Sequence, residues 1–155
     1  MKKVITAVAF ALLAFPVLAQ NKPAAQVYSG VEIQHQLEQL ATPAKEKGSS
    51  GATLGDFGSH ALKLSLRSSS GGAEIHAHFD DVMVVTQGTA TLVTGGALVD
   101  PQTGSDGESK GTSIRDGVSQ NIVVGDIVHV PAGTPHQLLI PKGMLFSALV
   151  VKIRE

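Results

Sequence analysis

Two histidines one residue apart, His76 and His78, lie in the stretch EIHAHFDDVMVVTQG, which runs from Glu74 to Gly88. Alternate side chains of a β-strand share a face, so both imidazoles are expected to point the same way. Glu74 has the same parity, and Asp81 follows where the chain could turn into the next strand. Imidazoles and carboxylates bind divalent metals, so this stretch indicates part of a metal site.

A third histidine follows in the segment GDIVHVPAGTPHQLLI. His136 is expected to begin a strand directly after the turn PAGTP, which makes it a further candidate ligand. The sequence contains no cysteine, and this excludes both a thiolate metal site and a disulfide framework. If a metal binds, its ligands must therefore be histidines and carboxylates.

The N-terminal segment is interpreted as a cleaved signal peptide, residues 1–19. Lys2 and Lys3 precede an apolar run, Val4–Ala19, that ends in Val-Leu-Ala. An uncleaved membrane anchor is the alternative, but the run is shorter than the roughly 20 residues of a spanning helix. Nothing after it is apolar enough to span a membrane. We therefore expect a periplasmic or secreted bacterial protein with no membrane contact after cleavage.

Residues 20–52 are predicted to form a leader and one helix. Ser29 and Glu32 have the spacing of a capping box, and Pro43 is expected to end or kink the helix. Apolar residues recur at helical intervals: Ile33, Leu37 and Leu40. The helix is expected to lie against a larger body.

Residues 53–155 are predicted to form an all-β domain. The segment ALKLSLR alternates leucines with Lys63, Ser65 and Arg67, which indicates a half-buried strand with a solvated polar face. Should Arg67 reach the mouth of a barrel, it could bind a carboxylate substrate. The polar segment ALVDPQTGSDGESKGTSIRDG is expected to be a surface loop or loose hairpin. Many short strands separated by Gly and Pro turns are typical of a sandwich or barrel. They are AEIHAH, DVMVVTQG, TATLVTGG, NIVV, DIVHVP, HQLLI and MLFSALVVKI.

The two histidine segments together resemble the two motifs of the cupin superfamily. The first motif of that family is a glycine, HxH, a Glu a few residues later, and a glycine after six more. This chain has His76, His78, Asp81 and Gly88 at such positions. The second motif is a glycine, five residues, PxG, two residues, a histidine, three residues and an Asn. This chain matches it with Gly125, Pro131, Gly133 and His136 and has Ile140 in place of the Asn. The resemblance covers roughly residues 62–151.

The resemblance implies a double-stranded β-helix, or jelly-roll barrel, with one divalent metal held by His76, His78, Asp81 and His136. Three imidazoles and one carboxylate would suit Fe(II), Mn(II), Zn(II), Ni(II) or Cu(II). Asp81 is one methylene shorter than the usual Glu and stands one residue closer to the histidine pair. Glu74 or Asp80 could therefore supply the carboxylate instead.

No general base stands out in the sequence, and the catalytic candidates are Glu74 and His129. His129 alternates with Val128 and Val130, so it faces away from the core if those valines fill it. The alternative to a metal site is a barrel without metal whose histidines are satisfied by hydrogen bonds.

Charge excludes one class of partner. The chain has 12 Lys and Arg against 13 Asp and Glu, without a basic stripe, so nucleic-acid binding is not expected. The resemblance implies a small-molecule partner and a homodimer. An oxygenase, isomerase or lyase type of activity is one reading. A ligand-binding or structural cupin without catalysis is the other.

Overall fold

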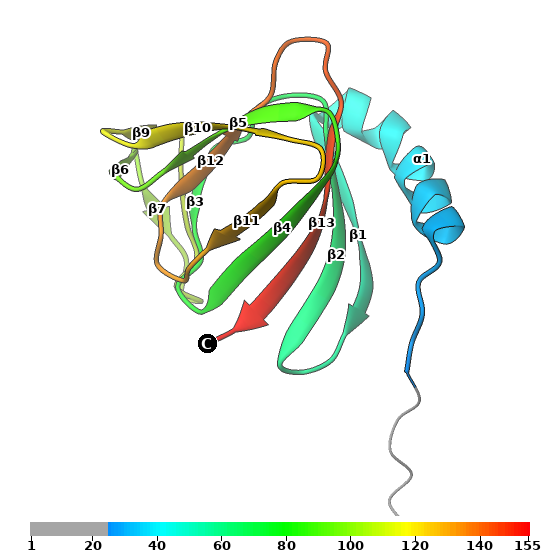
Figure 1. Ribbon diagram of the computed structural model, residues 1–155. Helices are drawn as coiled ribbons and strands as arrows, with labels where there is room; N and C mark the ends of the chain where they lie inside the picture. The colour runs from blue at the N-terminus through cyan, green and yellow to red at the C-terminus, as the bar shows by residue number, and fades with distance from the viewer. Residues whose placement is uncertain (1–24) are drawn as a thin grey trace, which may run out of the picture.

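The computed structural model describes residues 25–155, so the predicted signal peptide lies outside the described residues (Figure 1). The described chain begins with helix α1 (Gly30–Lys47) and continues with short strands. They are β1 (Ser49–Asp56), β2 (His60–Arg67), β3 (Ala73–Ile75), β4 (Phe79–Gln87), β5 (Thr89–Thr94), β6 (Ala97–Val99), β7 (Gln102–Thr103), β8 (Ser109–Gly111), β9 (Ser113–Arg115), β10 (Val118–Val123), β11 (Ile127–Val130), β12 (His136–Leu139) and β13 (Phe146–Arg154).

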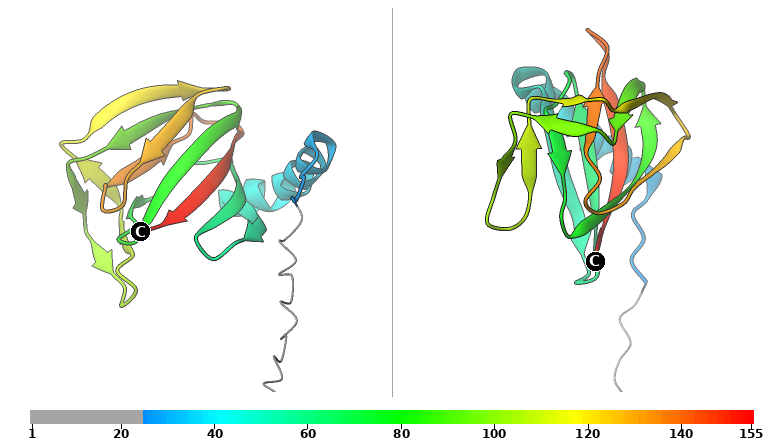
Figure 2. Two further views of the ribbon diagram at one scale, coloured as in Figure 1. Left: turned by 60° about the horizontal axis from the view of Figure 1, so that its bottom comes forward. Right: turned by 90° about the vertical axis from the view of Figure 1, so that its left-hand side faces the viewer.

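Two antiparallel sheets face each other and form the barrel (Figure 2). One sheet has the order β1-β2-β13-β4-β11, and the other has the order β10-β5-β12-β3-β8-β7. A separate pair, β6 and β9, extends from one side. Strands distant in sequence lie side by side, since β13 pairs with both β2 and β4. This is the double-stranded β-helix that the sequence predicts, with one N-terminal helix outside it.

The apolar core fills the space between the two sheets. Its buried members are mainly aliphatic: Met83, Val85, Ala90, Leu92, Ile122, Val130, Ile140, Phe146, Ala148 and Val150. Gly88 connects β4 to β5 with a φ of 73°. A side chain there would collide with the carbonyl oxygen of Leu145, which explains the glycine at this motif position.

Helix α1 begins at the predicted cap, where the Ser29 hydroxyl accepts a hydrogen bond from the Glu32 N–H at 3.1 Å. Of the two expected effects of Pro43, ending the helix does not occur, because α1 continues through it to Lys47. Ala44, the next residue, is fully buried against the sheet, and this packing holds the last turn. Within residues 25–155 no helix is long and apolar enough to cross a bilayer.

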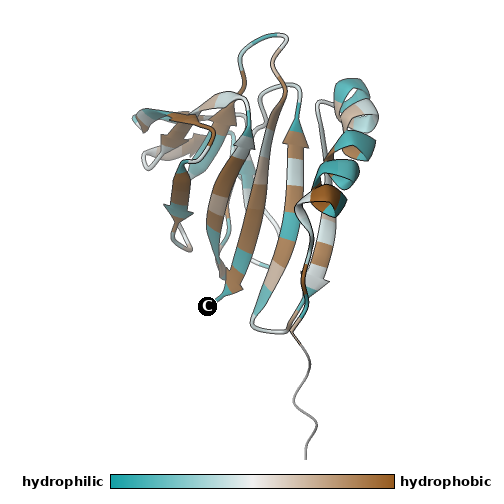
Figure 3. Cartoon of the chain, turned by 45° about the vertical axis from the view of Figure 1, so that its right-hand side comes forward, coloured by the Kyte–Doolittle hydropathy of each residue, from teal (hydrophilic) through white to brown (hydrophobic). Residues whose placement is uncertain are grey.

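Strand β2 has its two faces reversed with respect to the prediction. Leu64 and Leu66 pack under α1 on the outside of the barrel. The alternating polar residues Lys63, Ser65 and Arg67 instead line the barrel interior, and the banding of β2 is visible in Figure 3. Polar and apolar residues do alternate along β2, as the sequence predicts. The pattern alone does not reveal that helix α1 covers the apolar face. The sheet also begins at Ser49, ahead of the expected boundary at residue 53.

Candidate metal centre

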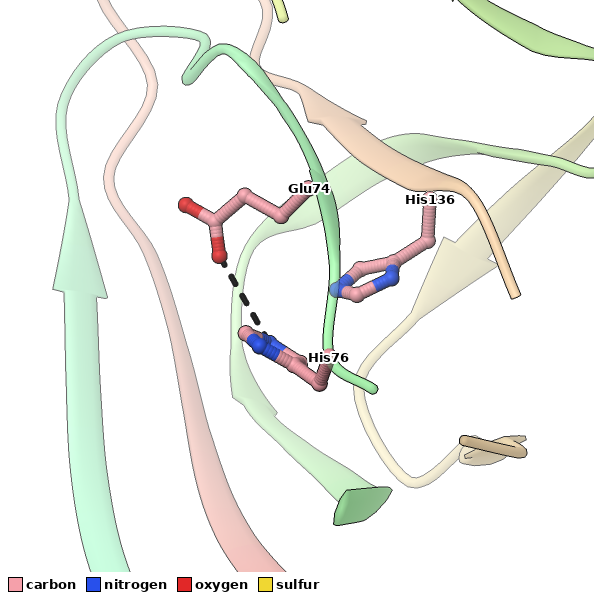
Figure 4. A group of neighbouring side chains, drawn as sticks. All are labelled: Glu74, His76 and His136. Carbon is pink, nitrogen blue, oxygen red and sulfur yellow. Dashed lines mark ion pairs between the residues drawn. The ribbon is translucent and has the colours of Figure 1, made fainter. Parts of the chain in front are cut away.

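Three potential ligands converge where β3 meets β12. Glu74 on β3 lies opposite His136 on β12 in the strand pair, and His76 follows directly after the end of β3. One donor atom from each of the three lies within 4.8 Å of the other two. Figure 4 shows the three side chains turned toward one another. Antiparallel pairing thus brings together residues that are some 60 positions apart in sequence.

The separations fit a single ion. His76 Nε2 lies 3.6 Å from Glu74 Oε2 and 3.4 Å from Asp81 Oδ2. Ligand atoms that each sit about 2.1 Å from a metal are separated by roughly 3.0–3.6 Å at coordination angles of about 90–120°. The separation between His76 and Glu74 is thus compatible with their binding one divalent cation.

Both histidines are oriented by hydrogen bonds on their other ring nitrogen. His136 Nδ1 lies 3.0 Å from the carbonyl oxygen of Thr134, which can only accept, so Nδ1 carries the hydrogen. His76 Nδ1 is bonded to the carboxylate of Glu108. The Nε2 atom of each ring is thus turned toward the cluster. Such outer hydrogen bonds commonly fix the tautomer of metal-binding histidines.

Glu108 was not predicted as part of the site. It lies at the end of the β7–β8 turn, within the segment expected to be a surface loop, 32 residues from His76. Its second oxygen, Oε1, is buried without a hydrogen-bond partner. An acidic residue in a Gly- and Ser-rich segment carries no local signal of such a role, so only the folded chain reveals it.

The two histidines differ in proton affinity. Burial by itself lowers the pKa of His76, but the hydrogen bonds to Asp81 and Glu108 outweigh it and raise the pKa above 6.5. For His136, burial dominates and lowers the pKa, despite the Thr134 carbonyl. His136 is therefore neutral near pH 7, whereas the two carboxylates make His76 hold its proton more firmly than an ordinary histidine does.

His78 lies away from the cluster. Strand β3 ends at Ile75, and Ala77 and His78 form a turn in which the His78 side chain is exposed. The expectation that His76 and His78 share a strand face is wrong, because the alternation rule applies only while the chain stays extended. Glu74, which the sequence offers as an alternative carboxylate, converges with His76 and His136 instead.

Asp81 lies at the edge of the cluster with its charge already paired. Its carboxylate is buried on β4, and Lys152 on the neighbouring strand donates to it at 2.7 Å. Burial raises the pKa of Asp81, but the hydrogen bonds from His76 and Lys152 lower it below 3.8 overall. Asp81 thus contacts His76, while Glu74 is the carboxylate that converges with both histidines.

Asp80 and His129 lie on the outer face of the barrel. His129 is exposed, and its Nε2 lies 2.9 Å from Asp80 Oδ2. The other Asp80 oxygen accepts from the Ala132 N–H at 2.7 Å and so anchors the PAGTP turn. Neither residue faces the cluster, which corrects the proposals of Asp80 as ligand and His129 as catalytic residue.

The cluster opens into a cavity of about 250 Å³ inside the barrel. Sequence reasoning did not assign Lys152 or Gln137 to it, because neither is a residue of the two histidine motifs. The polar and charged residues of the wall are Lys63, Ser65, Arg67, Glu74, His76, Asp81, His136, Gln137 and Lys152. A small polar molecule would contact both signs of charge here.

Comparison with known proteins bears on the fold. No family model and no curated protein sequence matches this chain. Solved structures do resemble it. A double-stranded β-helix protein from Klebsiella pneumoniae aligns with TM-score 0.52 at 14% identity, covering 70% of this chain and 78% of that one. The cupin domain of Schizosaccharomyces pombe Cnp3 aligns with TM-score 0.53 at 9% identity, covering 70% and 66%. This chain has the cupin fold.

A third structural neighbour is a lyase. The DMSP lyase DddQ from Ruegeria pomeroyi aligns with TM-score 0.52 at 16% identity, covering 71% of this chain and 49% of the lyase. This chain thus spans about half the length of that enzyme. At such identities the likeness extends to the fold, and the reaction must be argued from the cluster itself.

Proposed function

We propose that this cupin binds one divalent metal ion through Glu74, His76 and His136 and acts with it on a small molecule in the barrel cavity. The main support is the orientation of the two imidazoles. Each Nδ1 is hydrogen-bonded to an acceptor outside the cluster, and each Nε2 is turned inward. Two imidazoles and one carboxylate suit Fe, Mn, Zn, Ni or Cu and leave positions open for water or substrate.

A metal bound here would supply a Lewis acid next to the cavity. The residues of the chain would do the rest. Glu74 would be occupied as a ligand, so the groups left to exchange protons with a bound molecule are Asp81 and Lys152, which already share a hydrogen bond. The cupin fold supports lyase, isomerase and oxygenase chemistry alike, so the proposal includes an enzyme of any of these three types.

One observation favours a second candidate function, a small-ligand-binding protein without metal. Protonated His76 is satisfied by Glu108 and Asp81, and Asp81 is also paired with Lys152. The buried charges of the cluster are therefore paired without any cation from outside. In this alternative the cavity binds a molecule without turning it over.

Metal content decides between the two. We expect the purified protein, expressed with Fe, Mn, Zn, Ni and Cu available, to contain close to one metal per chain by mass spectrometry. His76→Ala and His136→Ala should lose it, and Glu74→Gln should weaken binding more than Asp81→Asn. His78→Ala is the matched control, because it removes a nearby histidine that is exposed and lies outside the cluster. Metal below about a tenth of an equivalent in the unaltered protein would contradict the proposal and favour the metal-free binder.

A further inference from the structure

The cavity holds cations that the metal cluster does not use. Arg67 and Lys63 lie on the inner face of β2 and line the same cavity as Glu74, His76 and His136. Both residues are only partly exposed. A positive side chain that faces a barrel interior loses much of its hydration, so it requires a partner of opposite charge.

Arg67 has no such partner in the described chain. Among residues 25–155, no carboxylate lies within ion-pair distance of its guanidinium, and its Nε is buried without a hydrogen-bond acceptor. The two carboxylates of the cavity are engaged elsewhere. Asp81 is bound by Lys152, and Glu74 faces His76. The guanidinium therefore lines the cavity without a counter-charge from the described residues, which leaves that place to an anion from outside the protein.

The position of the guanidinium is defined by its surroundings. A Cβ at Gly71 would collide with Arg67 Nη1, so the absence of a side chain at Gly71 is what admits the guanidinium. The buried Gln137 side chain donates to the Gly71 carbonyl oxygen at 2.9 Å and holds this backbone in place. Arg67 is thus held by the fold at the cavity wall and does not extend freely into solvent.

The net charge of the cavity indicates how much negative charge the missing anion carries. In the metal-free protein a protonated His76 is balanced by Glu108, and the other charged side chains of the wall are three cations, Lys63, Arg67 and Lys152, against two anions, Glu74 and Asp81. One negative charge would balance them. The guanidinium presents parallel N–H donors that match the two oxygens of a carboxylate. A volume of about 250 Å³ admits only a small molecule.

We propose that Arg67 binds the carboxylate of a small organic monoanion, with Lys63 adding attraction, while the remainder of that molecule extends toward Glu74, His76 and His136. This inference deepens the proposed function, and it rests on that function in assuming that the molecule acted upon occupies this cavity. It assigns the two ends of the cavity different tasks, recognition of an anion at Arg67 and chemistry at the histidine cluster.

The test is an anion titration of the metal-free protein. Butyrate and benzoate would be titrated into EDTA-treated protein by calorimetry, with butyramide and benzamide as neutral partners of the same shape and inorganic phosphate as a competing anion. We expect the carboxylates to bind at least tenfold more tightly than the amides and to shift the Arg67 Nε–H resonance in a ¹H–¹⁵N spectrum. Phosphate binding tighter than both carboxylates would overturn the carboxylate assignment.

Variants identify the residue responsible. Arg67→Gln should weaken butyrate and benzoate binding at least tenfold, Arg67→Lys should fall between it and the unaltered protein, and Arg115→Gln should have no effect. Arg115 is a matched control, because its side chain is 73% exposed and pairs with Asp116 outside the cavity. Equal affinity for acid and amide, or full carboxylate affinity in Arg67→Gln, would overturn the inference.

These measurements test the proposed anion site and the proposed metal site independently. Because the titration uses metal-free protein, carboxylate binding can be present even if the metal proposal is wrong. Conversely, Arg67→Gln should retain the metal content of the unaltered protein. Should Arg67→Gln fold poorly, the Nε–H shift in the unaltered protein still decides the question, since an unmoved resonance at saturating benzoate contradicts the inference.

Discussion

His76 has acidic groups at both ring nitrogens: Glu108 is bonded at Nδ1, and the carboxylates of Asp81 and Glu74 lie within ion-pair distance of Nε2. Only Nε2 faces the cluster that contains His136. A metal bound there would replace the proton on Nε2 and leave the hydrogen bond between Nδ1 and Glu108 intact. In the proposed metal site Glu108 would act as a positioning residue: it contacts His76 and would not contact the ion.

We predict that Glu108→Gln weakens metal binding by about tenfold to a hundredfold, the usual effect of removing such an outer partner. The loss has two causes, a less basic imidazole and a ring that is no longer held in place. A competition titration against a chromophoric chelator measures it. Glu46→Gln, an exposed change on α1, is the control, and equal affinity in both variants would refute the role of Glu108.

The pair of Asp81 and Lys152 sets a second prediction, this time of stability. Lys152→Met leaves a buried carboxylate with one partner fewer, and we expect it to lower the free energy of unfolding at pH 7 by about 1–3 kcal/mol. Urea unfolding followed by circular dichroism measures the change. Lys142→Met, in an exposed turn, should be close to neutral.

The pH dependence of this effect has a definite sign. The pKa of Asp81 is lowered in the folded protein, so its stabilising contribution is present above about pH 3.8 and is lost as the pH falls through the folded value. The difference in stability between Lys152→Met and the unaltered protein should therefore shrink once the pH falls below about 3.8. A difference that stays constant over this range would show that the ion pair is not its source.

At the scale of elements, α1 and the β7–β8 hairpin serve the barrel in different ways. The hairpin carries Glu108 to the cluster from a segment that the sequence marks only as polar. The helix packs Leu37 and Ala44 on the outer leucines of β2 and so buries the face of that strand opposite the cavity. By covering this face, α1 leaves the polar face of β2 for the interior.

We predict that Leu37→Ala lowers the free energy of unfolding by about 2–4 kcal/mol, the typical cost of truncating a buried leucine. Metal and carboxylate affinity should be unchanged, since Leu37 lies outside the barrel wall. Val31→Ala on the same helix is the control, because Val31 is 83% exposed, and it should change stability by less than about 0.5 kcal/mol. Chemical denaturation of the two variants provides the comparison. A large loss of metal affinity in Leu37→Ala would mean that the helix also shapes the site.

For the whole molecule, export remains a prediction. We expect protein made in a bacterial host with its full N-terminus to be recovered from the periplasm starting at Gln20. Intact-mass measurement of that fraction tests this, and Ala19→Arg should block processing. Protein that keeps Met1 in the same fraction would refute cleavage. The expected homodimer can be tested on the same sample by sedimentation velocity.

The sequence alone determined the features that depend on short-range patterns of residues. The capped helix, the period-two strands, the barrel class and the candidacy of His76 and His136 were all accessible, because periodicity and turn chemistry act over a few residues. The motif spacing led to the same fold that the solved structures show.

Only the tertiary structure decided which polar groups meet. His78 is turned outward by the end of β3, Glu74 converges because β3 pairs with β12, and Glu108 arrives from a distant hairpin. Arg67 faces the cavity because α1 covers the opposite face of β2. These outcomes depend on strand ends, register and long-range packing, in which residues far apart in the chain compete for the same space. No local pattern in the sequence encodes the result of that competition.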